Sequence, residues 1–347
     1  MNLLVVGGGA IGSLLAARSA VAGHTVTLLA RPATVEAVAR DGLRLIEVDG
    51  RVLTVPVHAA ATPADVWRTG PFDLAVLAVK SYDTAVAAAG LRPGLPASTP
   101  LLSVQNGVGN ENTLAEVLAS PILAAALTTP VEVDAPGEVR VARASHKAAL
   151  APWRGDVPLE PVAAWLRAAG FTTQVFADGP ALKWSKLLMN IVANAQPAIL
   201  GMTPDQVFAQ PALGDLEVRA WQEALAVLRA LQITPVALGG YPLALFGTLV
   251  ARVPVRVVRP FMARFIVGGR GSKPPSLTYD LQPQPRGRSE VAWLNGAVAA
   301  AGRRVGVATP VNSVFTEVLT ALVEGRTPWV DWRGQPQRLL TAVAQRT

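Results

Sequence analysis

Residues 2–12 read Asn-Leu-Leu-Val-Val-Gly-Gly-Gly-Ala-Ile-Gly, an apolar run that passes directly into the spacing Gly7-x-Gly9-x-x-Gly12. In a strand–turn–helix unit, the first glycine makes the tight turn and the second lets the backbone approach a pyrophosphate. The third lets the helix pack closely on the strand. The helix predicted over residues 10–22 offers free N–H groups and partial positive charge to phosphates. This stretch predicts dinucleotide binding; the alternative is a tight strand–helix turn without a ligand.

The end of the second predicted strand, Thr25–Ala30, indicates which dinucleotide is bound. NAD-binding units usually place an acidic residue there to hold the ribose hydroxyls. Here Arg31 follows the strand, and no acid stands near that point. A guanidinium pairs with a 2′-phosphate and stacks on adenine, so Arg31 favours NADP, with NADPH as its reduced form. The alternative is an exposed arginine that closes a strand.

Composition limits the remaining classes. The chain has 347 residues, of which 51% are hydrophobic and 16% charged, which predicts one or two domains with a packed core. The absence of cysteine excludes disulfides and thiolate metal sites. The three histidines stand far apart in the sequence, so no metal site is expected. Because the first strand begins at residue 2, we expect no cleavable signal and take the cytoplasm as the default location.

Strands and helices alternate through the first half of the chain. The pair Leu43–Val48 and Val52–Val57, joined by Asp49-Gly50, predicts a hairpin with a type I′ turn. Continuous apolar runs are typical of parallel strands that helices cover on both faces. Further strands are predicted over Asp73–Val79, Leu101–Gln105, Ile122–Leu127, Val139–Val141, Ala148–Ala151 and Thr172–Phe176, with helices from about Asp83 and near 158–169.

After about residue 178 the strand signals stop and a 3.6-residue periodicity takes over. Helices are predicted over 181–200, 213–232, 243–266, 289–302 and 311–324. We therefore expect an α/β Rossmann-type, doubly wound domain over residues 1–178 and an all-α domain over residues 179–347. The uncharged stretch Ile233–Ala251 contains Pro235, Pro242 and Gly239-Gly240, so it predicts two core-facing helical pieces joined by a turn rather than a membrane span.

Polar residues recur every four positions in the first of these helices. Lys186, Asn190 and Asn194 are spaced to share one face, whereas the opposite positions are apolar: Leu187, Leu188, Ile191 and Val192. A lysine and two amides on an otherwise apolar helix suit a small polar ligand that carries an oxyanion. The alternative is a solvated helix face.

At this point the sequence resembles a known family, the ketopantoate reductases (2-dehydropantoate 2-reductases), over nearly its whole length. The order and rough spacing of the motifs are the family's. They are the Gly7–Gly12 box, Arg31, Val-Lys80-Ser-Tyr-Asp83-Thr, Val-Gln-Asn106-Gly-Val, Pro136-Gly137-Glu-Val139, Trp184-x-Lys186-x3-Asn190-x3-Asn194, Ser276-Leu-x-x-Asp280 and Arg-Ser-Glu290-x4-Asn295-Gly296. The resemblance implies a C-terminal helical domain similar to that of 6-phosphogluconate dehydrogenase.

The resemblance also implies residue roles. The expected catalytic residues are Lys186, the general acid, and Glu290. Lys80, Asn106 and Glu290 are expected to line the junction of nicotinamide and substrate, where Lys80 and Asn106 bind the cofactor. Asn190, Asn194 and Ser276 are expected to hold the substrate. The expected cofactor loop is Gly7, Gly8, Gly9, Ala10, Ile11 and Gly12. A cation near a developing alkoxide stabilises its charge, and a nearby donor discharges it by proton transfer. For Glu290 the alternative is an ordinary acid at a helix start.

Two stretches depart from the family pattern. The linker from Asp280 to Glu290 is about two residues longer than usual, and Ala209–Gly271 is roughly twenty residues longer than in shorter members. From Arg252 to Arg288 there are eight basic residues and one acid, a surplus equal to the net charge of the whole chain, +7. This segment has no nucleic-acid reader motif, and Phe261 and Phe265 are expected in the core. The alternatives are a solvated, partly self-paired surface and an anion-attracting rim.

The expected function is NADPH-dependent reduction of 2-dehydropantoate to pantoate, on the route to pantothenate and coenzyme A. One alternative is a reductase of another branched 2-oxoacid, because the helical domain is longer than usual. Another is a non-catalytic, NADP-binding redox sensor, which would have no need of a proton donor. The expected partner is a small-molecule 2-oxoacid, with neither nucleic acid nor membrane. The sequence leaves open the oligomeric state, a homodimer included, and the product stereochemistry.

Overall fold

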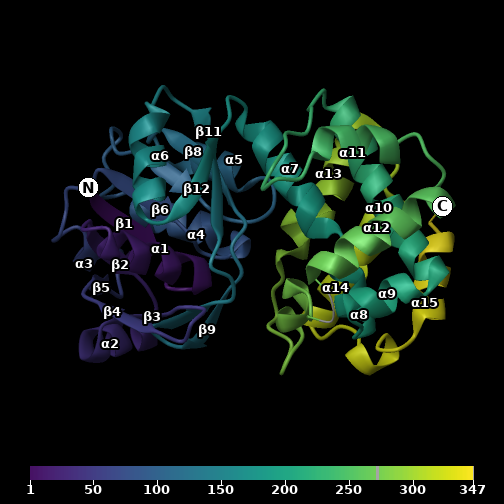
Figure 1. Ribbon diagram of the computed structural model, residues 1–347, viewed down its shortest axis with the longest axis horizontal. Helices are drawn as coiled ribbons and strands as arrows, with labels where there is room; N and C mark the ends of the chain where they lie inside the picture. Colours follow the sequence, from purple (N-terminus) through teal and green to yellow (C-terminus); the bar gives the residue numbers. More distant parts are fainter. Residues whose placement is uncertain (271–272, 347) are drawn as a thin grey trace. The chain divides into compact units, whose positions relative to one another are not determined.

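The computed structural model describes residues 1–270 and 273–346, which fall into two compact units. The first comprises Met1–Gln105 and Gly109–Lys183, and the second comprises Asn106–Val108 and the chain from Trp184 onward. The first unit is built on parallel strands and the second is helical (Figure 1). The predicted fold class, a Rossmann-type α/β domain followed by an all-α domain, is confirmed.

An eight-stranded sheet organises the first unit, in the order β12-β11-β8-β7-β6-β1-β2-β5. Every neighbouring pair is parallel except β8 with β11. The strands are β1 (Asn2–Val6), β2 (Thr25–Leu29), β5 (His58–Ala60), β6 (Leu74–Leu77), β7 (Leu101–Ser103), β8 (Ile122–Leu127), β11 (His146–Arg154) and β12 (Phe171–Val175).

Both faces of this sheet are buried because successive strand residues point to opposite sides. In β1, Leu3 and Val5 enter one core cluster, and Leu4 and Val6 enter the other. The first cluster includes side chains of α1 (Ala10–Val21) and α6 (Leu159–Ala168). The second includes those of α3 (Pro63–Val66), α4 (Thr84–Leu91) and α5 (Asn110–Val117).

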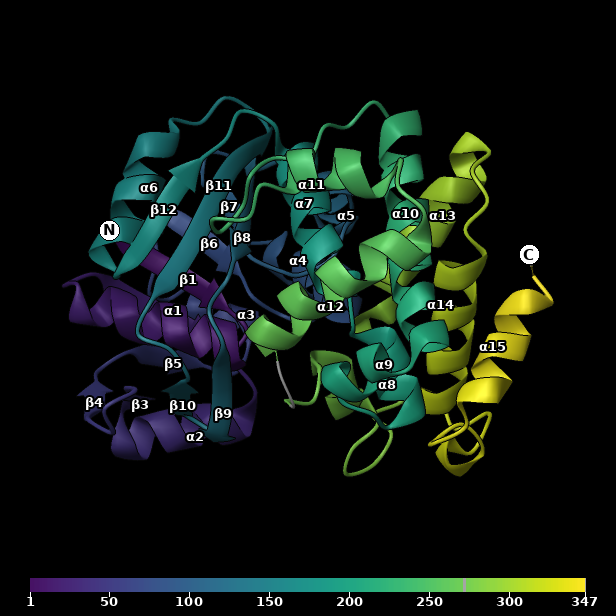
Figure 2. The same cartoon turned by 45° about the vertical axis from the view of Figure 1, so that its right-hand side comes forward.

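A four-stranded sheet, ordered β4-β3-β10-β9, completes the first unit with helix α2 (Pro32–Asp41). Helix α1 contacts strands of both sheets and lies between them (Figure 2). The strands of the small sheet are β3 (Leu43–Ile46), β4 (Val52–Val55), β9 (Val131–Ala135) and β10 (Glu138–Val141).

The predicted hairpin of β3 and β4 is present, but its predicted type I′ turn is wrong. The Gly50 N–H donates to the Glu47 carbonyl at 2.9 Å, and only Gly50 of the loop has a positive φ, at +82°. A type I′ turn needs positive φ at both central residues, whereas a type I turn followed by a left-handed glycine gives a three-residue loop. Asp49 therefore keeps an ordinary backbone conformation.

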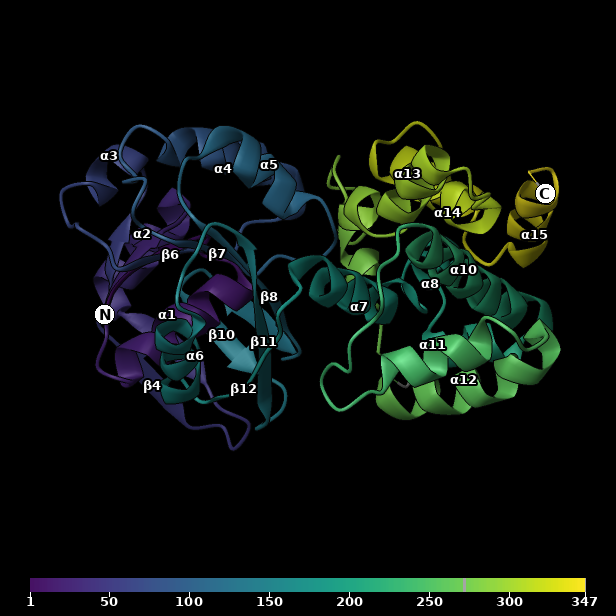
Figure 3. The same ribbon diagram turned by 90° about the horizontal axis from the view of Figure 1, so that it is seen from above.

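Helix α10 (Pro211–Ala230) is central to the second unit, where it contacts α9, α12, α13 and α14 (Figure 3). Its inward face carries large apolar side chains such as Leu216, Trp221 and Leu228. The other helices are α7 (Gly179–Ile191), α8 (Ala195–Leu200), α9 (Pro204–Ala209), α11 (Leu243–Val250), α12 (Val255–Arg270), α13 (Asn295–Val305), α14 (Pro310–Val323) and α15 (Pro336–Ala344), with short 3₁₀ helices η1 (Ser81–Asp83), η2 (Ser276–Asp280), η3 (Glu290–Trp293) and η4 (Trp329–Asp331).

The prediction of two helical pieces over Ile233–Ala251 is wrong, because only α11 forms there. Residues before α11 make a tight turn in which Leu238 and Tyr241 exchange backbone hydrogen bonds. Gly239 and Gly240 both have positive φ, so the backbone reverses where a helix would have to continue. Within the described residues, no helix is long and apolar enough to cross a membrane.

Candidate active site

The glycine loop between β1 and α1 has the close approaches that its spacing predicts. A Cβ on Gly12 would lie 1.8 Å from the Gly7 carbonyl oxygen, so strand and helix can approach only if residue 12 is glycine. Gly7 has φ of +115°, which favours glycine at the turn. A Cβ on Gly9, in contrast, would meet no described atom within 4 Å.

Gly9 also caps α1, and it does so without a side-chain hydrogen bond. The N–H groups of the first helical turn receive no side-chain acceptor from the cap, and the space beside Gly9 is open. A phosphate group fits such a cradle, because it needs backbone donors and close access to the chain. Ala10 and Ile11 supply the first helical N–H groups, and a Cβ on Gly8 would collide with Ala30.

Arg31 and Lys80 each lie between a parallel strand of the first unit and the helix that follows it. Arg31 lies just beyond β2 and is the residue before the first turn of α2, with an exposed side chain. Lys80 lies beyond β6 and precedes η1, and it too is exposed. Both residues follow the carboxyl ends of parallel strands, which is where ligands bind in open α/β sheets.

Lys186 and Asn190 lie on α7, one helical turn apart. Lys186 is buried and Asn190 half-buried, so Lys186 does not sit on a solvated helix face. The four apolar positions predicted opposite them, from Leu187 to Val192, are all at most 4% exposed.

The prediction that Asn194 continues this helical face is wrong. Helix α7 ends at Ile191, and Ala193 has a φ of +47°, so Asn194 caps a separate helix, α8, instead of continuing α7. The Ala193 N–H donates to the buried Glu217 carboxylate at 2.7 Å, which supports the break. The Asn194 amide nevertheless donates to the Asn190 carbonyl at 3.0 Å, so the two residues remain neighbours.

Asn194 brings Ser276 to the same place. The Asn194 side chain and the Ser276 hydroxyl are 3.3 Å apart, and the Leu277 N–H donates to Asn194 Oδ1 at 3.1 Å. Ser276 opens η2, so this amide fixes the start of that 3₁₀ helix. The buried amide thus joins two segments that are 82 residues apart in the sequence.

Asn106 is hydrogen-bonded to the same group. The Asn190 amide nitrogen donates to Asn106 Oδ1 at 3.1 Å. The segment Asn106–Val108 belongs to the second unit, and the Val108 N–H donates to the Trp293 carbonyl at 3.0 Å. A Cβ on Gly107 would lie 2.6 Å from that carbonyl oxygen, so only glycine allows this contact.

Glu290 begins η3, the 3₁₀ helix that ends at Trp293, and it is 8% exposed. The preceding residue, Ser289, caps η3 and donates to the Asp280 carboxylate at 2.8 Å. The Arg286 N–H donates to the Asp280 carbonyl at 2.9 Å, so the long linker from Asp280 to Glu290 folds back on its first residue. These bonds hold Ser289, the residue before Glu290, beside Asp280 at the end of η2.

Some basic residues of the segment from Arg252 to Arg288 form ion pairs with carboxylates of the protein. Arg259 lies 2.9 Å from the Asp215 carboxylate, whereas Arg252, Arg256 and Arg264 are exposed. Phe261 is 68% exposed, so the prediction that it lies in the core is wrong: Val258 and Met262 form the buried face of α12. The side chains of Phe265 and Arg270, as well as residues 271–272, lie outside the described part of the chain.

Comparison with known proteins identifies the family. The model of the family "Ketopantoate reductase PanE/ApbA" matches residues 3–155, and that of its C-terminal domain matches residues 180–323. The 2-dehydropantoate 2-reductase of Halobacterium salinarum is 31% identical over 323 residues, which cover 92% of this chain and 98% of that protein. The chain belongs to the ketopantoate reductase family.

Solved structures agree with this assignment. A ketopantoate reductase of the PanE/ApbA family from Ralstonia eutropha superposes with a TM-score of 0.79 at 28% identity, over 94% of this chain and 99% of that chain. The 2-dehydropantoate 2-reductase of Geobacter metallireducens gives 0.75 at 26% identity, over 94% and 100% of the two chains. D-mandelate dehydrogenase, solved with NADH and anilino(oxo)acetate, shares the fold with a TM-score of 0.79 at 19% identity.

The second unit contains six of the residues singled out by sequence: Asn106, Lys186, Asn190, Asn194, Ser276 and Glu290. Asn106, Asn190, Asn194 and Ser276 are linked by hydrogen bonds. Val108, two residues after Asn106, donates its N–H to the Trp293 carbonyl at the end of η3, the 3₁₀ helix that Glu290 begins. The glycine loop, Arg31 and Lys80 belong to the first unit.

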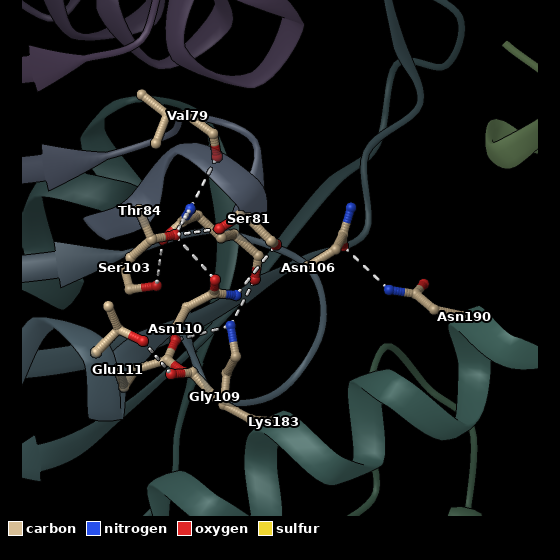
Figure 4. Close-up of polar contacts among 12 residues, drawn as sticks. Val79, Ser81, Thr84, Ser103, Asn106, Gly109, Asn110, Glu111, Lys183 and Asn190 are labelled. Carbon is tan, nitrogen blue, oxygen red and sulfur yellow. Dashed lines mark hydrogen bonds and ion pairs between the residues drawn. The ribbon is translucent and has the colours of Figure 1, made fainter. Parts of the chain in front are cut away.

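Sequence reasoning missed a buried polar network beside Asn106. Gln105 donates through its side chain to the Val79 carbonyl at 2.9 Å and to Thr84 at 2.8 Å, and its own carbonyl accepts from Lys183 (Figure 4). Lys183 forms an ion pair with Glu111 at 2.9 Å. The available signal was a lysine three residues before Lys186 on an apolar helix, in a chain with five lysines.

Proposed function

We propose that this protein reduces the keto group of 2-dehydropantoate to give pantoate, with NADPH as the reductant. The observation that supports this most directly is the hydrogen-bonded set Asn106–Asn190–Asn194–Ser276, with Lys186 one turn before Asn190 on α7. Residues 1–178 would bind the cofactor and residues 179–347 the substrate.

The first unit has groups suited to NADPH. The cradle at Gly9 and the N-terminus of α1 would take the pyrophosphate, and Arg31 the 2′-phosphate. Lys80 would stand at the nicotinamide end, beyond the neighbouring strand β6. When bound, NADPH supplies the hydride that converts the 2-oxo carbon into a 2-hydroxy carbon.

The second unit would hold the keto acid and supply the proton. Amide and hydroxyl groups of Asn190, Asn194 and Ser276 suit the carboxylate and hydroxyl of the substrate. Negative charge develops on the keto oxygen as hydride reaches the carbon, and the Lys186 ammonium would stabilise that charge and then donate a proton to the oxygen. The balance is one hydride and one proton added to the C=O bond, with NADP⁺ released.

A panel of 2-oxoacids tests the proposal. The purified protein is mixed with each acid and with NADPH or NADH, and absorbance of the reduced nicotinamide is followed. We expect the highest kcat/KM with 2-dehydropantoate and NADPH. A higher kcat/KM with another branched 2-oxoacid would move the substrate assignment to that acid. Binding of NADPH without any single turnover on the panel would favour a redox sensor instead.

A further inference from the structure

The buried ion pair between Lys183 and Glu111 has no role in the reaction described above. Both side chains are 0% exposed, and Lys183 Nζ lies 2.9 Å from Glu111 Oε1. Glu111 lies in the first turn of α5, and Lys183 is the last residue of the first unit, within α7. The pair thus joins the start of α5 to the part of α7 that precedes Lys186.

Such a pair is a poor device for stability alone. Burial removes the hydration of both charges, and apolar residues of similar volume often stabilise a fold as well or better. A fully buried ion pair does, however, restrict where the lysine ammonium group points its N–H donors. Its geometric consequences therefore matter more than the attraction between its charges.

One of those donors is directed to the backbone next to Asn106. Lys183 Nζ donates to the Gln105 carbonyl oxygen, which belongs to the peptide group that joins Gln105 to Asn106. The Gln105 side chain is held as well, by the Val79 carbonyl and the Thr84 hydroxyl. Asn106 is the next residue, and its Oδ1 accepts from Asn190 (Figure 4).

We propose that Lys183, held in place by Glu111, is a positioning residue that orients the peptide between Gln105 and Asn106 and so keeps the Asn106 amide against Asn190. The catalytic significance of this placement rests on the proposed function, which relies on the hydrogen-bonded set that contains Asn106 and Asn190. Lys183 itself is not assigned a contact with substrate or cofactor.

The test replaces the pair without leaving a lone charge. The double variant Lys183→Met/Glu111→Met keeps the side-chain volumes nearly constant and removes both charges, so we expect thermal stability close to wild type. The matched control is Arg18→Met/Glu47→Met, which removes another ion pair of the same unit, with 18% and 11% exposed side chains.

We expect the Lys183→Met/Glu111→Met variant to lower kcat/KM for the keto acid at least tenfold, with the dissociation constant for NADPH within about threefold of wild type. The control should retain kcat/KM. In an Asn106→Ala background, the same double change should add little further loss, because residues that act through one another are not additive. Full additivity, or an unchanged kcat/KM, would overturn the proposal.

A second measurement does not depend on turnover. The side-chain amide resonance of Asn106, assigned by its loss in Asn106→Ala, should be sharp in the wild-type protein and shifted or broadened in Lys183→Met/Glu111→Met. An unchanged resonance would contradict the positioning role even if no acid of the panel is reduced. A wild-type protein without turnover but with the expected change in this resonance would refute the proposed function and leave the positioning role supported.

Discussion

The Asn190 side chain donates a hydrogen bond to the Asn106 side chain at 3.1 Å across 84 residues of sequence. This contact joins the segment that follows β7 to the helix that carries Lys186. Asn190, a predicted substrate residue, is therefore held by Asn106, a predicted cofactor residue.

The first prediction concerns cofactor choice. Arg31→Ala should raise KM for NADPH about tenfold to a hundredfold, since a charge-assisted hydrogen bond contributes about 1.5–3 kcal/mol. KM for NADH should change little, because NADH has no 2′-phosphate. Steady-state kinetics with both cofactors measure this. Equal losses with both would show that Arg31 does not discriminate between them.

The second prediction concerns the proton donor. Lys186→Ala should lower kcat about 10²–10⁴-fold, the usual contribution of a general acid, while fluorescence titration shows nearly unchanged NADPH binding. Lys186→Arg should restore little activity, because arginine does not release its proton near neutral pH. Turnover close to wild type in Lys186→Ala would exclude this role.

Most of this fold could be predicted from the sequence, because the glycine spacing and the apolar runs that indicate it each span only a few residues. The glycine spacing depends on contacts such as that between Gly12 and the Gly7 carbonyl, and the apolar strands are buried on both faces. The break before Asn194 carries no such signal: alanine favours helix, yet Ala193 adopts a positive φ where its N–H meets Glu217. Tertiary contact overrode local preference there.

The same limit applies to the candidate site. The spacing of Lys186 and Asn190 predicted one helical face. The pairing of Lys183 with Glu111 instead depends on a contact within the first unit between residues 72 positions apart in the sequence. Lys183 stands out as a lysine on an apolar helix, but nothing in the sequence near Glu111 marks that residue as its partner. Likewise, the chain length of the Asp280–Glu290 linker did not indicate that it closes on Asp280.

The third prediction separates two roles of the Ser289–Glu290 turn. Glu290→Ala should lower kcat/KM and leave the free energy of unfolding nearly unchanged. Ser289→Ala should instead cost about 1 kcal/mol of stability, because Ser289 caps η3, and it should spare turnover. Kinetics and urea unfolding of both variants measure this. Normal kcat/KM in a destabilised Glu290→Ala would make Glu290 part of the cap.

The fourth prediction concerns pH and stability. His146 is 4% exposed, and its Nε2 lies 3.0 Å from the Arg18 guanidinium. Burial, with a further contribution from Arg18, lowers the pKa of His146 below its ordinary 6.5, although Glu47 opposes this. The fold therefore favours neutral His146, and its contribution to stability is present above the unfolded pKa and lost as pH falls below about 6.5.

Urea unfolding at a series of pH values from 8 to 5 measures this contribution. His146→Gln removes the titrating group and retains an oxygen that can accept from Arg18, so its free energy of unfolding should fall less steeply with acidification. Identical pH slopes for the wild-type protein and the variant would show that His146 is not responsible.

The last prediction concerns the basic segment. If the exposed arginines of this segment draw anions toward the protein, kcat/KM for a carboxylate substrate should fall as salt rises, because charges more than about 8–10 Å apart are screened at 0.1–0.15 M ionic strength. Arg252→Gln/Arg256→Gln should flatten this dependence and change kcat little. Arg259 is unsuitable for the test, because it pairs with Asp215 and its loss would leave that carboxylate unpaired.

The control Arg303→Gln/Arg304→Gln removes the same charge from exposed positions at the end of α13 and should keep the wild-type salt dependence of kcat/KM. Saturating NADPH excludes the effect of salt at Arg31. Equal slopes for all three proteins would show that the basic segment is a solvated surface, and that long-range attraction does not explain its charge.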